Sequence, residues 1–180
     1  MKKITLNLIR LNFHTMNRTE KMKIFLVDDD LMFMQSLKRV LSGDKADIKT
    51  FPTGEACLKS MEAETPVVVV MDYYLNGKSD KAMNGIQVMS KIKHSNPETE
   101  VIMLSAQDNV NVALDTLKYG AYDYINKEKS AFIKVKNDVR HISDRINRAD
   151  DFDKKMDRLK IINIWVFVAV ILIIIINWIS

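Results

Sequence analysis

The sequence is poor in the residues that support several common chemistries. It has a single cysteine, Cys57, so no disulfide can form within the chain, and a reducing compartment is the simpler interpretation. Its three histidines, His14, His94 and His141, are far apart and do not have the spacing of zinc ligands. These shortages argue against a disulfide scaffold and a zinc site.

The charge balance offers no indication of nucleic-acid binding. The 180 residues carry 27 basic and 23 acidic side chains, for a net charge of +4. The basic excess lies near the two ends of the chain, so the central part is close to neutral. With 47% hydrophobic and 28% charged residues, the composition is that of a folded protein. The length allows one domain of roughly 100–150 residues with appended segments.

Short apolar segments alternate with helical patterns through the centre of the chain. This alternation predicts an α/β fold, a parallel sheet with helices on both faces. The expected strands are Lys23–Val27, Asp47–Phe51, Val67–Met71, Glu100–Leu104 and Ala121–Asn126. The expected helices are Leu31–Leu41, Thr53–Ala63, Asn84–His94, Asn109–Lys118 and a segment from Ser130 onward.

Polar side chains follow four of these strands, at the point where each strand ends. They are Asp28, Asp29 and Asp30 after KIFLV, Asp72 after VVVVM, Ser105 after VIML, and Lys127 after YDYIN. The carboxyl ends of parallel strands meet at one edge of the sheet, so we expect these side chains to lie together. Clustered carboxylates repel each other unless a cation lies among them, and oxygen ligands favour Mg²⁺. The neighbouring hydroxyl and lysine could then hold the oxygens of a phosphoryl group.

These four strand ends resemble the signature motifs of the receiver domain of bacterial two-component response regulators. KIFLVDDD, VVVVMD, VIMLSA and GAYDYINK stand in the family's order, over roughly residues 22–142. The resemblance implies a five-stranded parallel sheet of order 2-1-3-4-5 and a role in phosphorelay signal transduction. The implied partner is a histidine kinase or a phosphotransfer protein. The implied activity is Mg²⁺-dependent self-phosphorylation and dephosphorylation only, so no other enzyme activity is expected.

The resemblance also implies a role for each matching residue. Asp72 would accept the phosphoryl group, Ser105 would donate a hydrogen bond to it, and Lys127 would form an ion pair with it. Tyr124 would be the aromatic residue coupled to the activation switch. The Mg²⁺ ligands would be Asp28, Asp29, Asp72 and the backbone carbonyl of Tyr74.

Three departures from the family pattern lie close to these motifs. Glu128 follows Lys127, and Asn76 stands four residues after Asp72, where the family usually has proline. The loop between Asp72 and Gly85 is several residues longer than usual. None of these changes removes a reacting group. They affect the loop geometry, the lifetime of the phosphate and the partner surface.

Two other functions stay open on the residues alone. A haloacid-dehalogenase-like phosphatase would use Asp28, Asp30, Ser105 and a lysine, but it needs a late acidic pair and usually a cap domain, and neither is evident. A receiver-like domain could also act as a binding module without phosphorylation. The joint placement of the four strand-end motifs favours the phosphoacceptor.

The C-terminal segment predicts a membrane anchor. Residues 161–179 carry no charge, and about 19 residues at 1.5 Å rise span a hydrocarbon core of about 30 Å. Trp165 and Trp178 stand near its ends, and basic residues precede it. We therefore expect a single-pass protein of the inner (cytoplasmic) membrane, with its receiver facing the cytoplasm.

The segments that flank the expected domain are less well defined. Residues 1–21 are expected to be a disordered extension, with a start at Met22 or a lipid-touching amphipathic arm as alternatives. Residues 143–160 are expected to be a helical linker, too short for a helix-turn-helix module, so no nucleic-acid partner is expected. Apolar residues recur at spacings of three and four from Phe132 to Leu159. Either the first half packs on the domain and the rest is solvated, or the whole helix pairs with a second copy as a homodimer.

Overall fold

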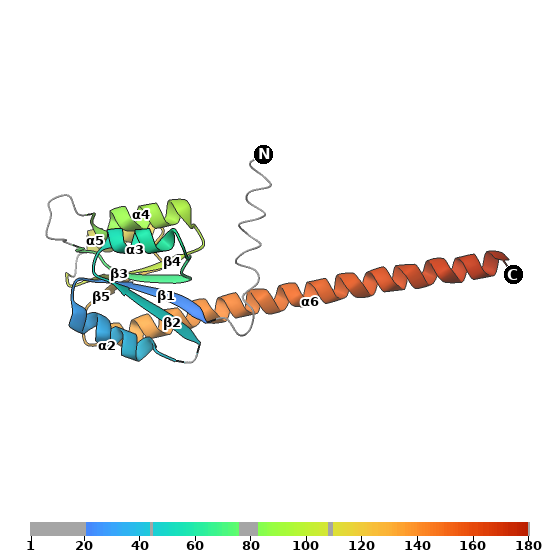
Figure 1. The fold of residues 1–180 in the computed structure, drawn as a ribbon, viewed down its shortest axis with the longest axis horizontal. Helices are drawn as coiled ribbons and strands as arrows, with labels where there is room; N and C mark the ends of the chain where they lie inside the picture. Colours follow the sequence, from blue (N-terminus) through green and yellow to red (C-terminus); the bar gives the residue numbers. More distant parts are fainter. Residues whose placement is uncertain (1–20, 44, 76–82, 108–109, 180) are drawn as a thin grey trace. The chain divides into compact units, whose positions relative to one another are not determined.

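The computed structural model describes residues 21–43, 45–75, 83–107 and 110–179 (Figure 1). Contacts within the chain divide it into two units. One unit runs from Thr19 to Ser143, and the other contains Asp144–Ser180. The expected extension over residues 1–21 lies, apart from its last residue, outside the described residues.

Strands and helices alternate through the unit that ends at Ser143. The strands are β1 (Met22–Val27), β2 (Ala46–Phe51), β3 (Val68–Asp72), β4 (Glu100–Ser105) and β5 (Asp123–Asn126). The helices are α2 (Leu31–Leu41), α3 (Gly54–Met61), α4 (Gly85–Ser95), α5 (Val110–Lys118) and α6 (Ala131–Ile179). Every expected element is present, with bounds that differ by no more than about two residues from those predicted.

The five strands form one parallel sheet of order β2-β1-β3-β4-β5. The predicted α/β fold and the predicted strand order 2-1-3-4-5 are therefore confirmed. Figure 1 shows α3, α4 and α5 on one side of this sheet, and α2 with the start of α6 on the other. This order places β1 and β3 side by side at the centre, so their carboxyl ends are neighbours.

The core lies against the central strand. Every residue of β3 is buried, as expected for an apolar strand that helices cover on both faces. On the α3–α4 side, Val69 and Met71 pack with Val88, Met89 and Ile92 of α4 in one hydrophobic cluster. The apolar faces of these helices thus fix the end of β3, where Asp72 lies.

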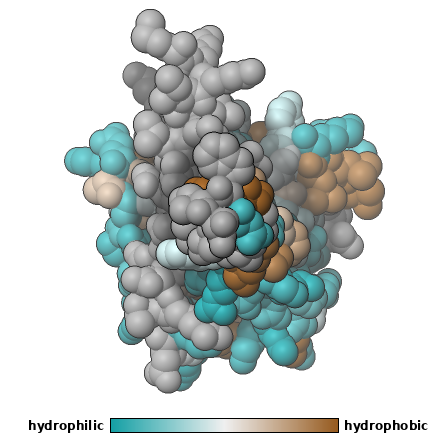
Figure 2. Space-filling model, turned by 90° about the vertical axis from the view of Figure 1, so that its right-hand side faces the viewer, coloured by the Kyte–Doolittle hydropathy of each residue, from teal (hydrophilic) through white to brown (hydrophobic). Residues whose placement is uncertain are grey.

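Side chains of α6 change from buried to exposed near Ser143, where the unit Thr19–Ser143 ends. Val135, Val139 and Ile142 are buried, whereas Phe152 and Met156 further along the same helix are exposed. The first half of the three-and-four spacing therefore packs on the domain, and the helix continues unbroken to Ile179. In the view of Figure 2, apolar residues (brown) reach the surface among hydrophilic ones (teal).

The predicted membrane anchor over residues 161–179 is wrong. Among the residues that the structure describes, no helix is long and apolar enough to cross a membrane. The predicted transmembrane helix and the predicted location in the inner (cytoplasmic) membrane are corrected accordingly.

Candidate functional site

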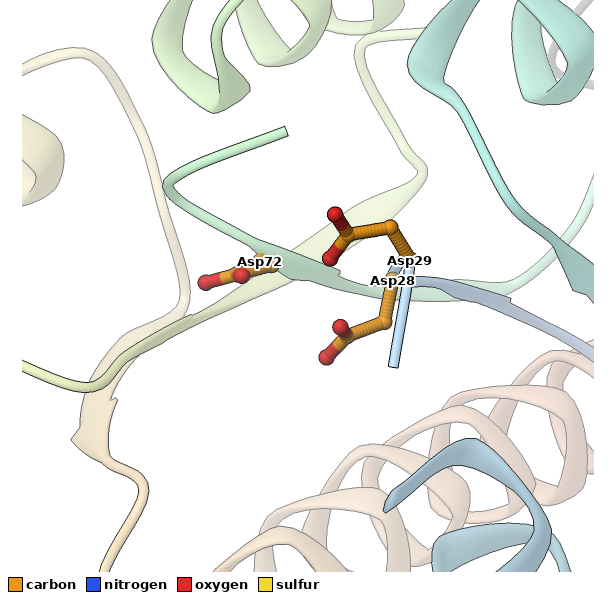
Figure 3. Close-up of side chains that lie close together, drawn as sticks. All are labelled: Asp28, Asp29 and Asp72. Carbon is orange, nitrogen blue, oxygen red and sulfur yellow. The ribbon is translucent and has the colours of Figure 1, made fainter. Parts of the chain in front are cut away.

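Three carboxylates meet at the carboxyl ends of two adjacent strands (Figure 3). Asp28 and Asp29 directly follow β1, and Asp72 is the last residue of β3. One carboxylate oxygen from each of the three lies within 4.8 Å of the others. Asp28 and Asp72 are buried, and Asp29 is exposed. The parallel register of β1 and β3 therefore brings together residues that are far apart in the sequence, as predicted.

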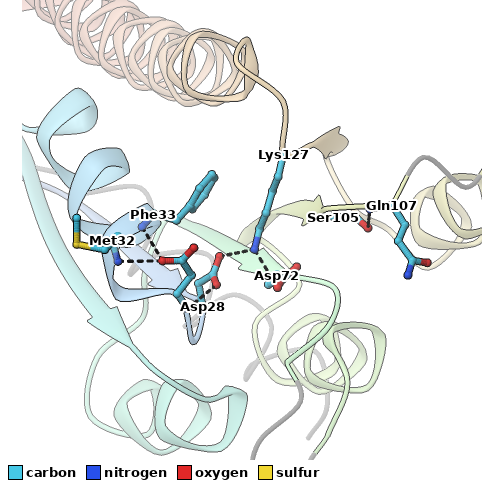
Figure 4. Close-up of polar contacts among 8 residues, drawn as sticks. Asp28, Met32, Phe33, Asp72, Ser105, Gln107 and Lys127 are labelled. Carbon is cyan, nitrogen blue, oxygen red and sulfur yellow. Dashed lines mark hydrogen bonds and ion pairs between the residues drawn. The ribbon is translucent and has the colours of Figure 1, made fainter.

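Lys127 is the cation of this site. It follows β5, and its Nζ lies 2.7 Å from Oδ2 of Asp28 and 2.9 Å from Oδ2 of Asp72 (Figure 4). Its side chain is only 13% exposed. Hydrogen bonds between charged groups are strong in such a partly desolvated position. Lys127 therefore joins the two buried carboxylates and limits their mutual repulsion.

Burial and pairing act on the protonation of these groups in opposite directions. Burial raises the pKa of Asp28, and this effect outweighs the hydrogen bond from Lys127, which lowers that pKa. Burial also opposes the charged form of Lys127, but its hydrogen bonds to Asp28 and Asp72 prevail and raise the pKa of this lysine. A cation bound beside Asp28 would favour its ionised form and offset the cost of its burial.

Asp30 has a different role from its two acidic neighbours. Its side chain caps α2, because Oδ1 accepts hydrogen bonds of 3.0 Å from the backbone N–H groups of Met32 and Phe33. Its own backbone N–H donates to Oδ1 of Asp28 at 2.9 Å. Asp30 is therefore a structural residue that fixes the start of α2 and holds Asp28 in place.

Ser105 lies beside the carboxylates at the end of β4. The register pairs Asp72 with Leu104, so Ser105 stands one residue further along the neighbouring strand. Its side chain is buried, and Oγ accepts a hydrogen bond of 3.1 Å from the backbone N–H of Gln107. A hydroxyl oxygen that accepts this bond keeps its own hydrogen for donation.

Gln107 connects Ser105, the last residue of β4, with two tyrosines. The hydroxyl of Tyr124 donates to the backbone oxygen of Gln107 at 2.9 Å. The hydroxyl of Tyr74 forms a 2.6 Å hydrogen bond with Oε1 of the same glutamine. Gln107, beside the site, therefore forms hydrogen bonds with Ser105, Tyr124 and Tyr74.

The close approach of α4 supports the strand end that carries Asp72. A Cβ atom added at Gly85 would lie 2.6 Å from the backbone oxygen of Asp72 and 2.9 Å from Cα of Tyr73. No real side chain tolerates such contacts with backbone atoms. Only glycine allows α4 to start this close to the phosphoacceptor candidate.

The donor set fits a small hard cation. Oδ1 of Asp72 is buried and has no hydrogen-bond partner among the described residues. It is one of three carboxylates that converge on one point, and a buried charged oxygen normally has a partner. Carboxylate oxygens in this number suit Mg²⁺, which binds through few protein ligands and keeps waters and phosphate oxygens.

Comparison with protein families gives one match, which covers most of the unit Thr19–Ser143. Residues 24–134 match the model of the response regulator receiver domain. The chain therefore belongs to the response regulator receiver family, and the resemblance stated from its motifs is confirmed. Receiver domains act in phosphorelay signalling and bind Mg²⁺ at an acidic cluster, and they interact with histidine kinases or phosphotransfer partners. The haloacid-dehalogenase-like alternative is thereby wrong.

Several curated proteins resemble the same part of the chain. The DNA-binding response regulator MtrA of Mycobacterium bovis is 32% identical over 139 residues, which cover 77% of this chain and 56% of that protein. The transcriptional regulator NtrC of Escherichia coli is 30% identical over 104 residues, 58% of this chain and 21% of NtrC. A protein-glutamate methylesterase of Paramagnetospirillum magneticum is 30% identical over 113 residues. The chain thus spans between about a fifth and somewhat over half of these relatives' lengths.

Solved structures agree with this assignment. The BeF3-activated receiver domain of DrrB, from Thermotoga maritima, has a TM-score of 0.59 and 29% identity, and the match covers 69% of this chain and 98% of that one. The receiver domain of NtrX from Brucella abortus has a TM-score of 0.56 and 29% identity, over 62% of this chain and 92% of its own. These likenesses concern the receiver fold alone.

One neighbour of the site was not predicted from the sequence. The ring of Phe33 lies 5.0 Å from Nζ of Lys127, measured to the ring centroid. The sequence places Phe33 on the apolar face of a helix, and such a position gives no sign of a lysine from the other end of the domain. Only the fold, which places the first turn of α2 next to the side chain of Lys127, brings the two together.

Proposed function

We propose that this chain is a response-regulator receiver that accepts a phosphoryl group on Asp72. The observation that carries the proposal is the position of Asp72. It is a buried carboxylate at the end of β3, 2.9 Å from the ammonium of Lys127 and within a group of three acidic side chains. One of its oxygens has no hydrogen-bond partner among the described residues, as an attacking oxygen requires.

The transfer is a displacement at phosphorus. An oxygen of Asp72 supplies the electron pair of the new O–P bond, and the bond from phosphorus to the donor's nitrogen or oxygen breaks. The leaving group keeps that electron pair, and a phosphohistidine donor then takes up a proton. Bound Mg²⁺ would neutralise the phosphoryl oxygens. Its proposed ligands are Asp28, Asp29, Asp72 and the backbone carbonyl of Tyr74.

The remaining residues hold the product. Lys127 forms the ion pair with the phosphoryl group, because its ammonium already lies between the two buried carboxylates. Ser105 donates its hydroxyl hydrogen to a phosphoryl oxygen. Since Oγ of Ser105 also accepts from Gln107, a shift of Ser105 loosens the residue that Tyr124 contacts. Tyr124 is in this way the proposed switch residue.

The wider role of the molecule follows from the same proposal. The phosphodonor is a histidine kinase or a phosphotransfer protein, and the output is a conformational change read by protein contacts. We place the receiver over residues 22–142 and a helical linker over 143–160. The exposed apolar residues Phe152, Met156 and Leu159 support pairing of α6 with a second copy. MtrA and NtrC are named as DNA-binding proteins, whereas the output that we propose for this chain is by protein contacts.

The test is phosphorylation of the full chain by acetyl phosphate, with and without Mg²⁺. We expect one phosphoryl group per chain, only when Mg²⁺ is present, and none in Asp72→Asn. Asp115→Asn, which changes an exposed carboxylate of α5, is the matched control and should behave as the wild type. Equal phosphorylation of Asp72→Asn and the wild type would contradict the proposal and favour a binding module that works without phosphate.

A further inference from the structure

Two phenylalanines join α2 to α6 beside the carboxylates. Phe33 lies in the first turn of α2 and Phe132 in the first turn of α6. Their ring centroids are 5.0 Å apart and their planes are inclined by 29°, a stacked pair. Both side chains are half-buried. Aromatic pairs at this distance are a favoured packing arrangement, so the start of α6 is held directly against α2.

The same ring also contacts the cation of the site. Nζ of Lys127 lies 5.0 Å from the centroid of Phe33, within the range of a cation–π interaction. Figure 4 shows the two side chains beside each other, next to Asp28 and Asp72. Because Lys127 is largely shielded from water, the attraction is less screened than at the surface. The ammonium therefore has three partners, two carboxylates and one aromatic face.

Phosphorylation would disturb this arrangement at one point. This step rests on the proposed function, in which Asp72 becomes an acyl phosphate. The new group adds negative charge and strong acceptor oxygens on the side of Asp72. Lys127, now 2.9 Å from Oδ2 of Asp72, would follow that charge and change its contact with Phe33. The ring of Phe33 is in turn stacked on the ring of Phe132, in the first turn of α6.

We propose that Phe33 is a positioning residue for Lys127 and that, through Phe132, it conveys the phosphorylation state of Asp72 to the start of α6. The aromatic face holds the ammonium where it meets both carboxylates before phosphorylation. The stacked pair then couples the movement of that ammonium to the helix that continues beyond Ser143.

Substitution by leucine separates this role from simple apolar packing. Leucine fills much of the same space but has no aromatic face. Phe33→Leu therefore removes the interaction with Lys127, and Phe132→Leu removes only the stacking. Phe51→Leu is the matched control, because Phe51 is also half-buried and lies 4.8 Å from another ring, that of Phe25.

The first measurement needs no phosphate. In NMR spectra of the full-length protein, the Cε methylene signals of Lys127 should show a ring-current shift. This shift should disappear in Phe33→Leu and persist in Phe51→Leu. Lys127 signals that are the same in the wild type and in Phe33→Leu would overturn the positioning role.

The second measurement compares hydrogen exchange of residues 131–142 with and without acetyl phosphate and Mg²⁺. The wild type and Phe51→Leu should change exchange there on phosphorylation. Phe33→Leu should accept phosphate about threefold more slowly, from the lost cation–π contact, and lose the exchange change. Phe132→Leu should accept phosphate at the wild-type rate and lose the exchange change as well.

The outcomes separate this inference from the proposed function. A phosphorylated Phe33→Leu or Phe132→Leu that keeps the full exchange change overturns the coupling. A wild type that takes no phosphate contradicts the proposed function and removes the coupling with it. The NMR result still decides the positioning role in that case.

Discussion

At the scale of single residues, the site depends on how two carboxylates share one ammonium. Lys127 contacts Asp28 and Asp72 at hydrogen-bond distance, whereas Asp29 is exposed and has no such contact among the ion pairs of the described residues. Asp28 and Asp72 are thus already partly neutralised. Asp29 contributes a carboxylate that a metal ion can reach from solvent.

Asp29→Ala and Lys127→Ala should therefore have separable effects. Asp29→Ala should weaken Mg²⁺ binding about tenfold or more and slow phosphorylation with it, since it removes a hard oxygen ligand. Lys127→Ala should preserve Mg²⁺ binding and impair phosphoryl transfer. Isothermal titration with Mg²⁺ and phosphorylation kinetics on both variants provide the check. Loss of Mg²⁺ binding in a folded Lys127→Ala protein would show that the roles are divided differently.

Cys57 gives a second residue-scale expectation. Burial raises the pKa of its thiol to about 12, and the thiolate is the reactive form. The folded protein should therefore react with a thiol reagent at pH 8 far more slowly than the urea-unfolded chain does. Rapid labelling of the folded protein at the unfolded rate would contradict the burial of Cys57.

At the scale of elements, the start of α4 fixes the end of β3. Gly85 brings the helix against the backbone of Asp72 and Tyr73 with no room for a Cβ atom. The N-terminus of α4 is closed by a reciprocal pair, in which Asn84 accepts from the N–H of Gln87 and the Gln87 side chain accepts from the N–H of Asn84. The helix therefore starts at one defined place, and any displacement of it moves Asp72.

Gly85→Ala should destabilise the fold by roughly 1–3 kcal/mol and slow phosphorylation, because the new methyl group displaces β3 or α4. Gly43→Ala is the matched control, since a Cβ at Gly43 has nothing within 4 Å. It should change the free energy of unfolding by less than about 0.5 kcal/mol. Urea unfolding of both variants measures the difference. Equal stability of the two would contradict the close approach of α4.

The elements also show what the sequence could and could not predict. The meeting of Asp28, Asp72, Ser105 and Lys127 followed from apolar segments that each end in a polar residue, because parallel strands end at one edge. The strand order came from the resemblance to the receiver family. The capping role of Asp30 was missed, since three consecutive aspartates look alike in a sequence. The contact of Phe33 with Lys127 depends on how α2 packs, which residue spacing does not encode.

The C-terminal helix was only partly predictable. A spacing of three and four correctly indicated a helix, and the burial of Val135 and Ile142 agrees with packing on the domain. The uncharged apolar run over residues 161–179 led to a predicted membrane span that the described residues do not support. Hydrophobicity along a chain measures the tendency to leave water and does not identify the partner surface.

The stability of the whole molecule should depend on pH through a carboxyl pair, Asp138 and Asp123, that is not part of the phosphorylation site. The pKa of Asp138, on α6, is raised from 3.8 to about 6 by burial and then by the charge of Asp123 and a hydrogen bond with it. The folded state thus keeps a proton that the unfolded chain loses. The free energy of unfolding should therefore fall as the pH rises from about 4 to about 6.

Asp138→Asn should remove this penalty and stabilise the protein by about 1 kcal/mol at pH 7, allowing for solvent screening of a partly buried group. Its stability should also vary less between pH 4.5 and pH 7. Asp151→Asn, exposed further along the same helix, serves as the control. Urea unfolding at the two pH values gives the comparison. An unchanged pH dependence in Asp138→Asn would show that another group is responsible.

We propose that the phosphoryl group is attached to Asp72. Chemical trapping of the acyl phosphate identifies the residue that carries it. The full-length protein is incubated with acetyl phosphate and Mg²⁺ and then reduced with borohydride, which converts an aspartyl phosphate to homoserine. Peptide mass spectrometry then locates the converted residue. We expect homoserine at position 72 and at no other aspartate. Conversion at Asp28 or Asp29 instead, or no conversion under conditions that keep the protein folded, would contradict the assignment to Asp72.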